Sequence, residues 1–288
     1  RFVKIRGSAA VLANNSKRPQ QQQAPGAYPM TSPLRLHIEH GLATMTFCAP
    51  ERANVLDLAM ARAFAAAVQQ IASDDSVRAI LITGEGKQFC AGGDINAFAD
   101  RSRELTDVLE ELLDPVLEGM KLLTLLPMPI ICAINGTVGG GGIGFALCGD
   151  IVLAAESMKL RGGYSAIGLT PDVGGSWFVT RRAGTGKAME VFLTNRPFTA
   201  AECCAIGLVD EVYPDSELQA KAHALALQLA QGPKQALARI KKLIESAQRH
   251  SLHAHFDMER ETMLASGVTD DAREGIKAFM EKRAPKFL

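Results

Sequence analysis

Residues 130–155 have the sequence IICAINGTVGGGGIGFALCGDIVLAA, in which a glycine-rich turn separates two short apolar runs. The runs at 129–134 and 151–154 are typical of strands that are buried on both faces. The turn leads into a short helix that ends near Cys148. A strand, a turn, a helix and a second strand in this order predict an α/β fold with a parallel sheet.

The sequence before this unit extends the same pattern. Apolar residues alternate with polar ones on both sides of His40-Gly41, which predicts a β-hairpin over 34–47. Apolar periodicity predicts three further elements, which are helices over 60–73 and 103–126 and a buried strand over 78–83.

The two ends of the chain differ from this pattern. Residues 1–29 contain unopposed basic residues and a glutamine run but no apolar segment of a secretory signal, so we interpret them as a disordered leader or an appended extension. After about Ser216 only helical periodicity remains, and Pro233 begins a helix with an apolar stripe. We therefore expect an α/β core over residues 30–215 and a helical region over 216–288.

The composition of the 288 residues excludes several classes of protein. Lys plus Arg (31) equals Asp plus Glu (31), so no basic field favours nucleic acid or an anionic membrane. No apolar run reaches the roughly 18 residues of a membrane span. The six cysteines form no CxxC pair, and the histidines at 250–255 lack metal-ligand spacing, so we expect buried thiols and no metal site. These features favour a cytoplasmic protein, or an organellar matrix protein if residues 1–29 are a transit segment.

Two glycine turns are candidates for a binding site. Phe89–Ile95 (FCAGGDI) follows the strand at 78–83, and residues 135–142 (NGTVGGGG) follow the strand at 129–134. Glycine allows a ligand to approach the backbone, and the free N–H groups at a helix start favour negative charge. The two turns together would hold one developing oxyanion, unless each is simply a tight connection.

The second turn also matches the GxGxxG pattern of dinucleotide-binding folds, through Gly139, Gly141 and Gly144. The helix that follows has fewer than ten residues, and the acidic residue expected about 20 positions later is absent. We therefore do not expect a nicotinamide cofactor.

Several segments of the chain resemble the enoyl-CoA hydratase/isomerase (crotonase) family in their order and spacing, over about residues 34–288. The segments are PERANVLD (50–57), FCAGGDI (89–95), INGTVGGGGIGFALCGDIVLAA (134–155), IGLTPDVGGSW (167–177), GLVDEV (207–212) and FMEKRAPKF (279–287). The resemblance implies a ββα spiral core, and a helical C-terminal region that forms homotrimers and often hexamers. It also implies acyl-CoA substrates, with coenzyme A as part of the substrate and no separate cofactor.

The resemblance also implies the parts of the site. Two backbone amides, which match Gly93 and Gly141, would hold the thioester oxygen. The coenzyme A portion would meet the backbone near Ala53 and the basic side chains of Arg52 and Lys282, which are otherwise ordinary surface cations. The remaining positions that the family uses for this portion are Gly93, Asp94, Ile95, Asn96 and Gly141, although Asp94 is more typical of a helix cap.

The sequence departs from the family's hydratases, which use two glutamates that would match Gly144 and Tyr164. The first carboxylate after these positions is Asp172, where members that shift double bonds, hydrolyse thioesters or displace halide can carry an aspartate. The alternative role for Asp172 is that of a turn or N-cap residue before a helix at 174–181. Tyr164 would line the acyl pocket or donate a hydrogen bond there, or it would simply pack.

The predicted helix over 103–126 carries candidates for a second carboxylate in the site. Its acids would mostly form a solvated face, although one of them is a candidate for the second group; they are Glu104, Asp107, Glu110, Glu111 and Asp114.

We therefore expect an acyl-CoA isomerase that forms a homotrimer or homohexamer. Three alternatives remain open at this point: a hydratase that uses other acids, a thioester hydrolase, and a catalytically silent acyl-CoA binder.

Overall fold

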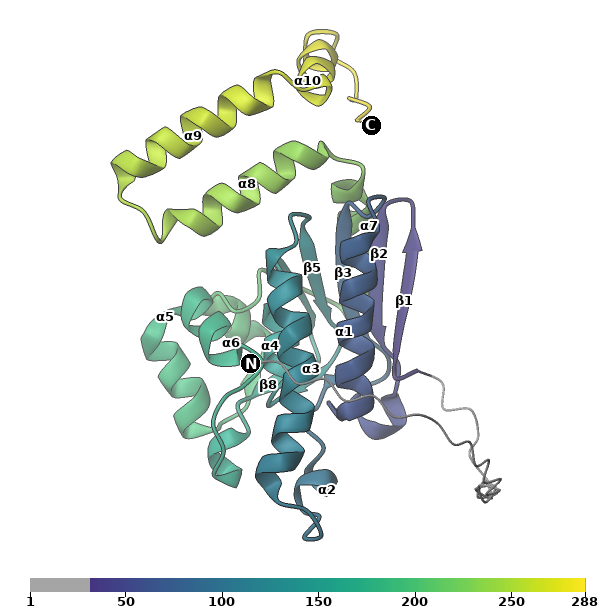
Figure 1. Ribbon diagram of the computed structural model, residues 1–288, viewed down its shortest axis with the longest axis vertical. Helices are drawn as coiled ribbons and strands as arrows, with labels where there is room; N and C mark the ends of the chain where they lie inside the picture. The colour runs from purple at the N-terminus through teal and green to yellow at the C-terminus, as the bar shows by residue number, and fades with distance from the viewer. Residues whose placement is uncertain (1–31, 288) are drawn as a thin grey trace, which may run out of the picture. The chain divides into compact units, whose positions relative to one another are not determined.

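A six-stranded sheet forms the centre of the computed structural model, which describes residues 32–287 (Figure 1). The leader or extension expected at residues 1–29 lies outside this range. In spatial order the strands are β1 (Leu34–Glu39), β2 (Leu42–Phe47), β3 (Ala79–Gly84), β5 (Ile130–Ile134), β7 (Ile151–Ala155) and β10 (Glu211–Tyr213). Only β1 is antiparallel to its neighbour, so the carboxyl ends of the other five strands share one edge.

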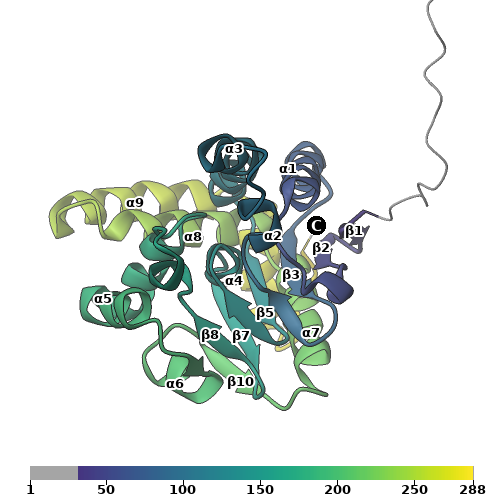
Figure 2. The ribbon, with the colours of Figure 1, turned by 90° about the horizontal axis from the view of Figure 1, so that it is seen from below.

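Helices cover both faces of this sheet because the central strands are apolar on both sides. All residues of β3 and β5 are buried, as the continuous apolar runs predict. Figure 2 shows α1 (Leu58–Ser73) and α3 (Leu105–Leu125) on one face and α7 (Leu218–Ala230) on the other. The predicted hairpin, the two predicted helices and the three predicted strands are confirmed, with small shifts at their ends.

A second, smaller sheet was not predicted, because its strands are too short to show a period of two. It consists of β4 (Gln88–Cys90), β6 (Thr137–Gly139), β8 (Lys159–Arg161) and β9 (Phe198–Thr199). The remaining helices of this part of the chain are η1 (Pro50–Arg52), α2 (Ile95–Phe98), α4 (Gly142–Leu147), η2 (Tyr164–Ile167), α5 (Gly175–Thr194) and α6 (Ala200–Ala205), of which only α5 is long. Because β4 and β6 are parallel neighbours, this sheet brings the two glycine turns together.

The C-terminal region is helical, as expected, but its first helix belongs to the core. The buried residues of α7 repeat every four positions and pack against the large sheet; they are Leu218, Ala222, Ala226 and Ala230. The boundary expected at residue 215 therefore lies within the packed core, which extends to about residue 230.

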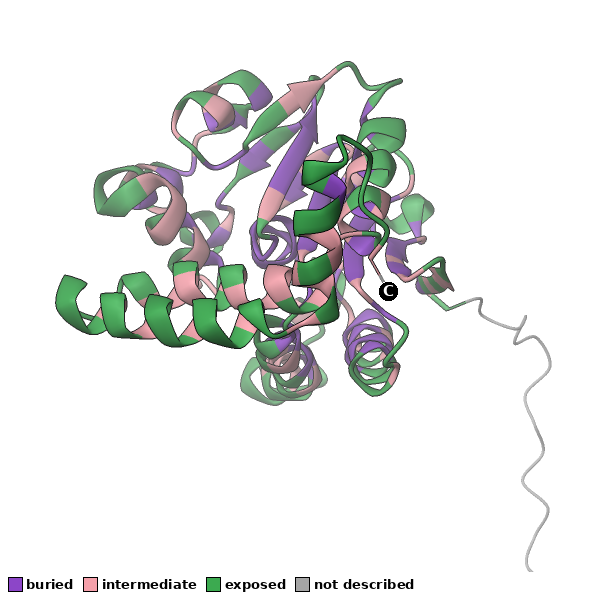
Figure 3. Ribbon diagram, turned by 90° about the horizontal axis from the view of Figure 1, so that it is seen from above, coloured by how far each residue is buried: buried purple, intermediate pink, exposed green. Residues whose placement is uncertain are grey.

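The last three helices are α8 (Lys234–Ala247), α9 (Leu252–Gly267) and α10 (Asp270–Met280). Neither α8 nor α9 has a buried residue, and Figure 3 shows their exposed surfaces. Large apolar side chains such as Met263 (73% exposed) and Phe279 (83%) face solvent in the isolated chain. Among residues 32–287 no helix combines the length and apolar character that a bilayer crossing requires.

Candidate active site

The two glycine turns pack backbone against backbone. A Cβ atom on Gly92 would lie 2.8 Å from the carbonyl oxygen of Gly139, and one on Gly142 would lie 2.4 Å from that of Cys90. Gly92 also has a φ of +95°, a conformation that L side chains rarely adopt. Contact therefore requires glycine at both positions, and at Gly92 the backbone conformation requires it as well.

Each turn contains backbone amides that have no protein acceptor within residues 32–287. Within residues 32–287, the N–H groups of Gly93 and Gly141 donate to no protein acceptor. Gly141 is the N-cap of α4, where amides are free to donate outward. Two free amides from neighbouring turns are the donor set that suits a single anionic oxygen.

Asp172 lies directly beside the second turn. A Cβ atom on Gly141 would be 3.1 Å from Oδ1 of Asp172. The hydroxyl of Tyr164 donates a hydrogen bond to the same Oδ1, and its oxygen accepts one from the Asp172 amide at 3.3 Å. Of its alternative roles, that of a helix cap is wrong, because α5 begins after Gly174 and has no side-chain cap. That of a turn residue is confirmed, because the Asp172 carbonyl accepts a hydrogen bond from the Gly175 amide at 2.8 Å.

The surroundings of Asp172 alter its acidity. Burial raises the pKa of the Asp172 carboxyl above its usual range, and the hydrogen bond from Tyr164 partly opposes this change. Burial also raises the pKa of the Cys90 thiol to about 12, and raises the pKa of the Tyr164 phenol. The thiol and the phenol are therefore both uncharged at neutral pH.

The turn that carries Asp172 fills the space that a side chain at Gly144, the position of the first hydratase glutamate, would need. Val173 has a φ of +49°, which is rare for a β-branched residue. Its carbonyl oxygen would lie 2.0 Å from a Cβ atom on Gly144, so no side chain fits at position 144 without moving the turn. The matching position of the second glutamate is filled by the buried Tyr164.

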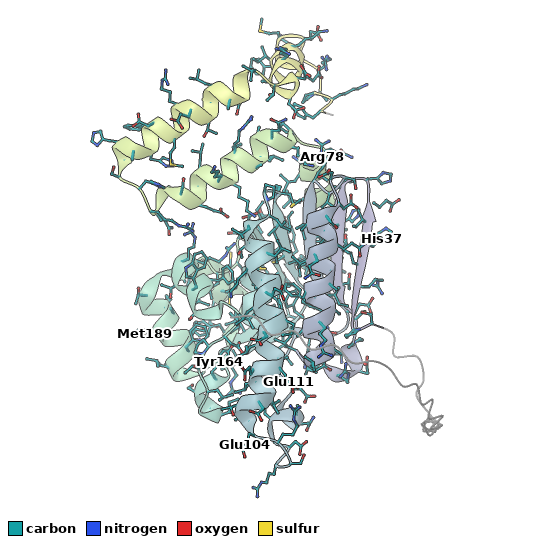
Figure 4. All side chains as sticks on the ribbon, in the orientation of Figure 1. His37, Arg78, Glu104, Glu111, Tyr164 and Met189 are labelled. Carbon is teal, nitrogen blue, oxygen red and sulfur yellow. The ribbon has the colours of Figure 1, made fainter. Side chains whose placement is uncertain are left out.

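The acids proposed at the beginning of α3 lie on its exposed surface. All five proposed carboxylates, from Glu104 to Asp114, are exposed, and Glu111 pairs with Arg103 at 2.7 Å. Figure 4 shows Glu104 and Glu111 at the outer, lower end of this helix. They form the solvated face that the sequence predicted as the main alternative.

The residues expected at the coenzyme A end are only partly brought together. Arg52 is exposed and pairs with Asp57 at 2.6 Å. The carbonyl of Ala53 accepts a hydrogen bond from the Ala91 amide at 3.1 Å, which places the Arg52 loop beside the first turn. Lys282 follows α10, and Figure 1 shows α10 at the opposite end of the ribbon from α2, so one chain does not bring Lys282 to this loop.

The start of α2 follows the first turn directly. Asp94 is the N-cap of α2 and accepts a hydrogen bond from the Asn96 amide at 2.9 Å, as its alternative role predicted. Ile95 and Asn96 are exposed beside it. The ring of Phe98 lies over the turn, because its Cζ would be 2.6 Å from a Cβ atom on Gly93.

Asn54 is a structural residue of the site that the sequence did not single out, and its side chain is fully buried. Its Oδ1 accepts from the Ala49 amide at 2.9 Å, and its Nδ2 donates to the carbonyls of Gln88 at 2.8 Å and Glu85 at 3.0 Å. The side chain thereby ties the Arg52 loop to β4. The signal in the sequence was a single polar residue between apolar ones in PERANVLD.

Other features of the described residues lie away from this site. A hollow of about 820 Å³ is lined by α8 and the beginning of α5, including Trp177, Arg181 and Ile240, and it contains none of the expected site residues. No group of three or more His, Cys, Asp or Glu side chains within 32–287 is placed to hold a metal ion.

Comparisons with known proteins agree with the fold. The family model described as enoyl-CoA hydratase/isomerase matches residues 37–288. A protein of Escherichia coli K12 named 1,2-epoxyphenylacetyl-CoA isomerase is 38% identical, over 87% of this chain and 96% of its own. A crystal structure of an enoyl-CoA hydratase from Bacillus anthracis superposes with a TM-score of 0.82 at 30% identity, covering 88% of this chain and 98% of the other. An enoyl-CoA hydratase from Polaromonas sp. JS666 gives the same TM-score and identity, with 88% and 99% covered.

Proposed function

Because the chain belongs to the enoyl-CoA hydratase/isomerase family and has its crotonase fold, we propose that it shifts a double bond in an enoyl-CoA. Asp172 carries the proton in this proposal, and the amides of Gly93 and Gly141 hold the thioester oxygen. The observation that carries it is the contact of the Asp172 carboxylate with the second glycine turn.

The reaction balances without a further reactant. Asp172 removes a proton from C2 of a 3-enoyl-CoA, and the electron pair of that C–H bond moves into the carbonyl, which becomes a dienolate oxygen. The two amides stabilise this oxygen, and one such donor contributes roughly 3–4 kcal/mol to lowering a barrier. The protonated Asp172 then returns the proton to C4, which leaves the double bond between C2 and C3. The raised pKa of Asp172 makes its carboxylate a stronger base for the first of these proton transfers.

Two further observations support an isomerase. No side chain fits at Gly144, and Tyr164 fills the position of the second glutamate, so the two carboxylates that orient and activate water in a hydratase are missing. The relative from Escherichia coli is named an isomerase of a CoA thioester.

For the coenzyme A portion we propose contacts with Arg52, the backbone at Ala53 and the start of α2 at Asp94–Asn96. Arg52 has five N–H donors, and its bond to Asp57 leaves others for a phosphate. Lys282 would reach the same group only where an assembly brings α10 of a second copy to this end of the core. We expect no cofactor besides the coenzyme A of the substrate.

The experiment is an incubation with crotonyl-CoA, with trans-3-hexenoyl-CoA and with 3-hydroxybutyryl-CoA, followed by mass spectrometry and absorbance. Conversion of the 3-enoyl-CoA to a conjugated 2-enoyl-CoA at constant mass is expected, and Asp172→Asn should slow it by roughly 10²-fold or more. A gain of water would identify a hydratase, and free coenzyme A would identify a hydrolase. No change with any substrate, combined with tight binding, would identify a silent acyl-CoA binder.

A further inference from the structure

Tyr164 touches the carboxylate on which the proposed function depends. Its ring is buried (6% exposed) and packs against the ring of Phe192 in α5, with 6.1 Å between centroids. The preceding residue, Gly163, has a φ of +83°, and its amide donates to Oδ1 of Asn195 at 2.7 Å. The Phe192 ring therefore fixes the position of the Tyr164 ring, and the Gly163 hydrogen bond fixes the backbone that precedes it.

The hydroxyl makes two hydrogen bonds to the same residue. It donates to Oδ1 of Asp172 and accepts from the Asp172 amide, so it fixes both the side chain and the backbone of that residue. Within residues 32–287 the other carboxylate oxygen, Oδ2, accepts no hydrogen bond. One oxygen is thus anchored beside Gly141 and the other is free to exchange a proton.

We propose that Tyr164 is a positioning residue that anchors Oδ1 of Asp172 and presents Oδ2 to the acyl chain. This inference rests on the proposed function, because it assigns Tyr164 a part in the proton transfer by Asp172. Simple packing would need only the ring, and phenylalanine would supply it. The hydroxyl is the part of the side chain that packing does not explain.

Few titratable groups surround Asp172, so the pH dependence of activity can be assigned to it. The titratable groups that face it are the Tyr164 phenol from η2 and the Cys90 thiol from β4, while α4 contributes only glycine and apolar residues. Burial raises the pKa of both the phenol and the thiol, so both stay neutral near pH 7. The acidic limb of activity therefore reports the Asp172 carboxyl.

The test is Tyr164→Phe, with Tyr213→Phe as a matched control. Tyr213 lies on the edge strand β10 and also donates to a carboxylate, that of Glu211. With trans-3-hexenoyl-CoA, Tyr164→Phe should lower kcat roughly ten- to hundredfold, the range for a lost hydrogen bond to a charged group, and leave KM within about threefold. The acidic limb of kcat/KM should move to higher pH, because the bond from Tyr164 lowers the pKa of Asp172. The control should change neither quantity.

A double-mutant cycle separates this inference from the proposed function. In the Asp172→Asn background, Tyr164→Phe should cause no further loss, because the hydroxyl acts through the carboxylate. If Asp172→Asn alone keeps full activity, the proposed function fails. If Asp172→Asn is inactive but Tyr164→Phe keeps both its kcat and its acidic limb, only the role of Tyr164 is refuted.

A second measurement does not depend on turnover. The difference in unfolding free energy between wild type and Asp172→Asn, followed against pH, reports the pKa of Asp172 in the folded protein. Because that pKa is raised, the wild type loses stability relative to the variant as pH rises through it. The pH at which this loss ends should be higher when both proteins carry Tyr164→Phe. An unchanged pH would overturn the inference even if the substrate were different.

Discussion

The contact between the two glycine turns can be tested by Gly92→Ala. The added Cβ would lie 2.8 Å from the carbonyl oxygen of Gly139 and 3.2 Å from Cα of Gly140. Ordinary contact requires about 0.6 Å more, so the turns must separate by roughly that distance. The alanine would also hold a φ of +95°, where L residues are strained.

The expected cost has two parts. The left-handed backbone contributes about 1–2 kcal/mol, and forcing a methyl group into a packed contact contributes about 1–3 kcal/mol. We therefore expect a loss of roughly 2–5 kcal/mol in unfolding free energy, measured by urea titration. Activity should fall by at least about tenfold, toward the roughly 10²–10³-fold of a missing oxyanion donor, because the two amides no longer point at one position.

Gly41→Ala is the control for backbone strain alone. Gly41 has a φ of +79°, and its added Cβ would meet mainly the flexible side chain of Arg78 at 3.3 Å. It lies in the β1–β2 hairpin, at the end of β2 opposite to the glycine turns. This variant should lose about 1–2 kcal/mol and keep its activity. If Gly92→Ala were as stable and as active as Gly41→Ala, the two turns would not form one site.

Three other predictions follow from the structure. Asp172→Asn should reduce turnover by roughly 10²-fold or more with little change in acyl-CoA affinity by calorimetry, and full activity would place the proton carrier elsewhere. Hydration of crotonyl-CoA should be at least about a hundredfold slower than in a two-glutamate family member, and Gly144→Glu should destabilise the fold by more than about 1–3 kcal/mol without restoring it. Light scattering at micromolar protein should return a trimer or hexamer that uses the exposed apolar residues of α8–α10; a mass near the 30.8 kDa of one chain would refute this.

The sequence predicted the large sheet well because its strands carry strong local signals. The strand at 78–83 is apolar throughout, and the structure buries every residue of β3. The second sheet has strands of only two or three residues, too short for a period to appear, so its existence depends on contacts between distant segments. The same applies to α7, whose four buried residues indicate a helix but not the face of the sheet that it covers.

The candidate site was predictable in its residues but not in its bonds. The glycine turns and Asp172 could be singled out from the sequence, and the structure brings Gly92, Gly139 and Asp172 together around Gly141. A hydrogen bond from Tyr164 was one of its expected roles and is confirmed, but its acceptor, Asp172, could not be identified from the sequence, because the two residues are brought together by the fold. Lys282 was matched by sequence position alone, and in one chain it stands apart from the rest.

The buried Asn54 side chain makes the two ends of the proposed substrate site thermodynamically linked. It bonds the loop that carries Arg52 to the strand that leads into Gly93, and the Ala53–Ala91 hydrogen bond joins them again. A ligand that shifts the loop is therefore expected to shift the Gly93 amide as well. Linkage requires the coupling free energy to be the same when a ligand at Gly93 acts on the loop. If bound coenzyme A changes the affinity of the turns for an enolate analogue, the analogue should change the affinity for coenzyme A by the same factor and in the same direction.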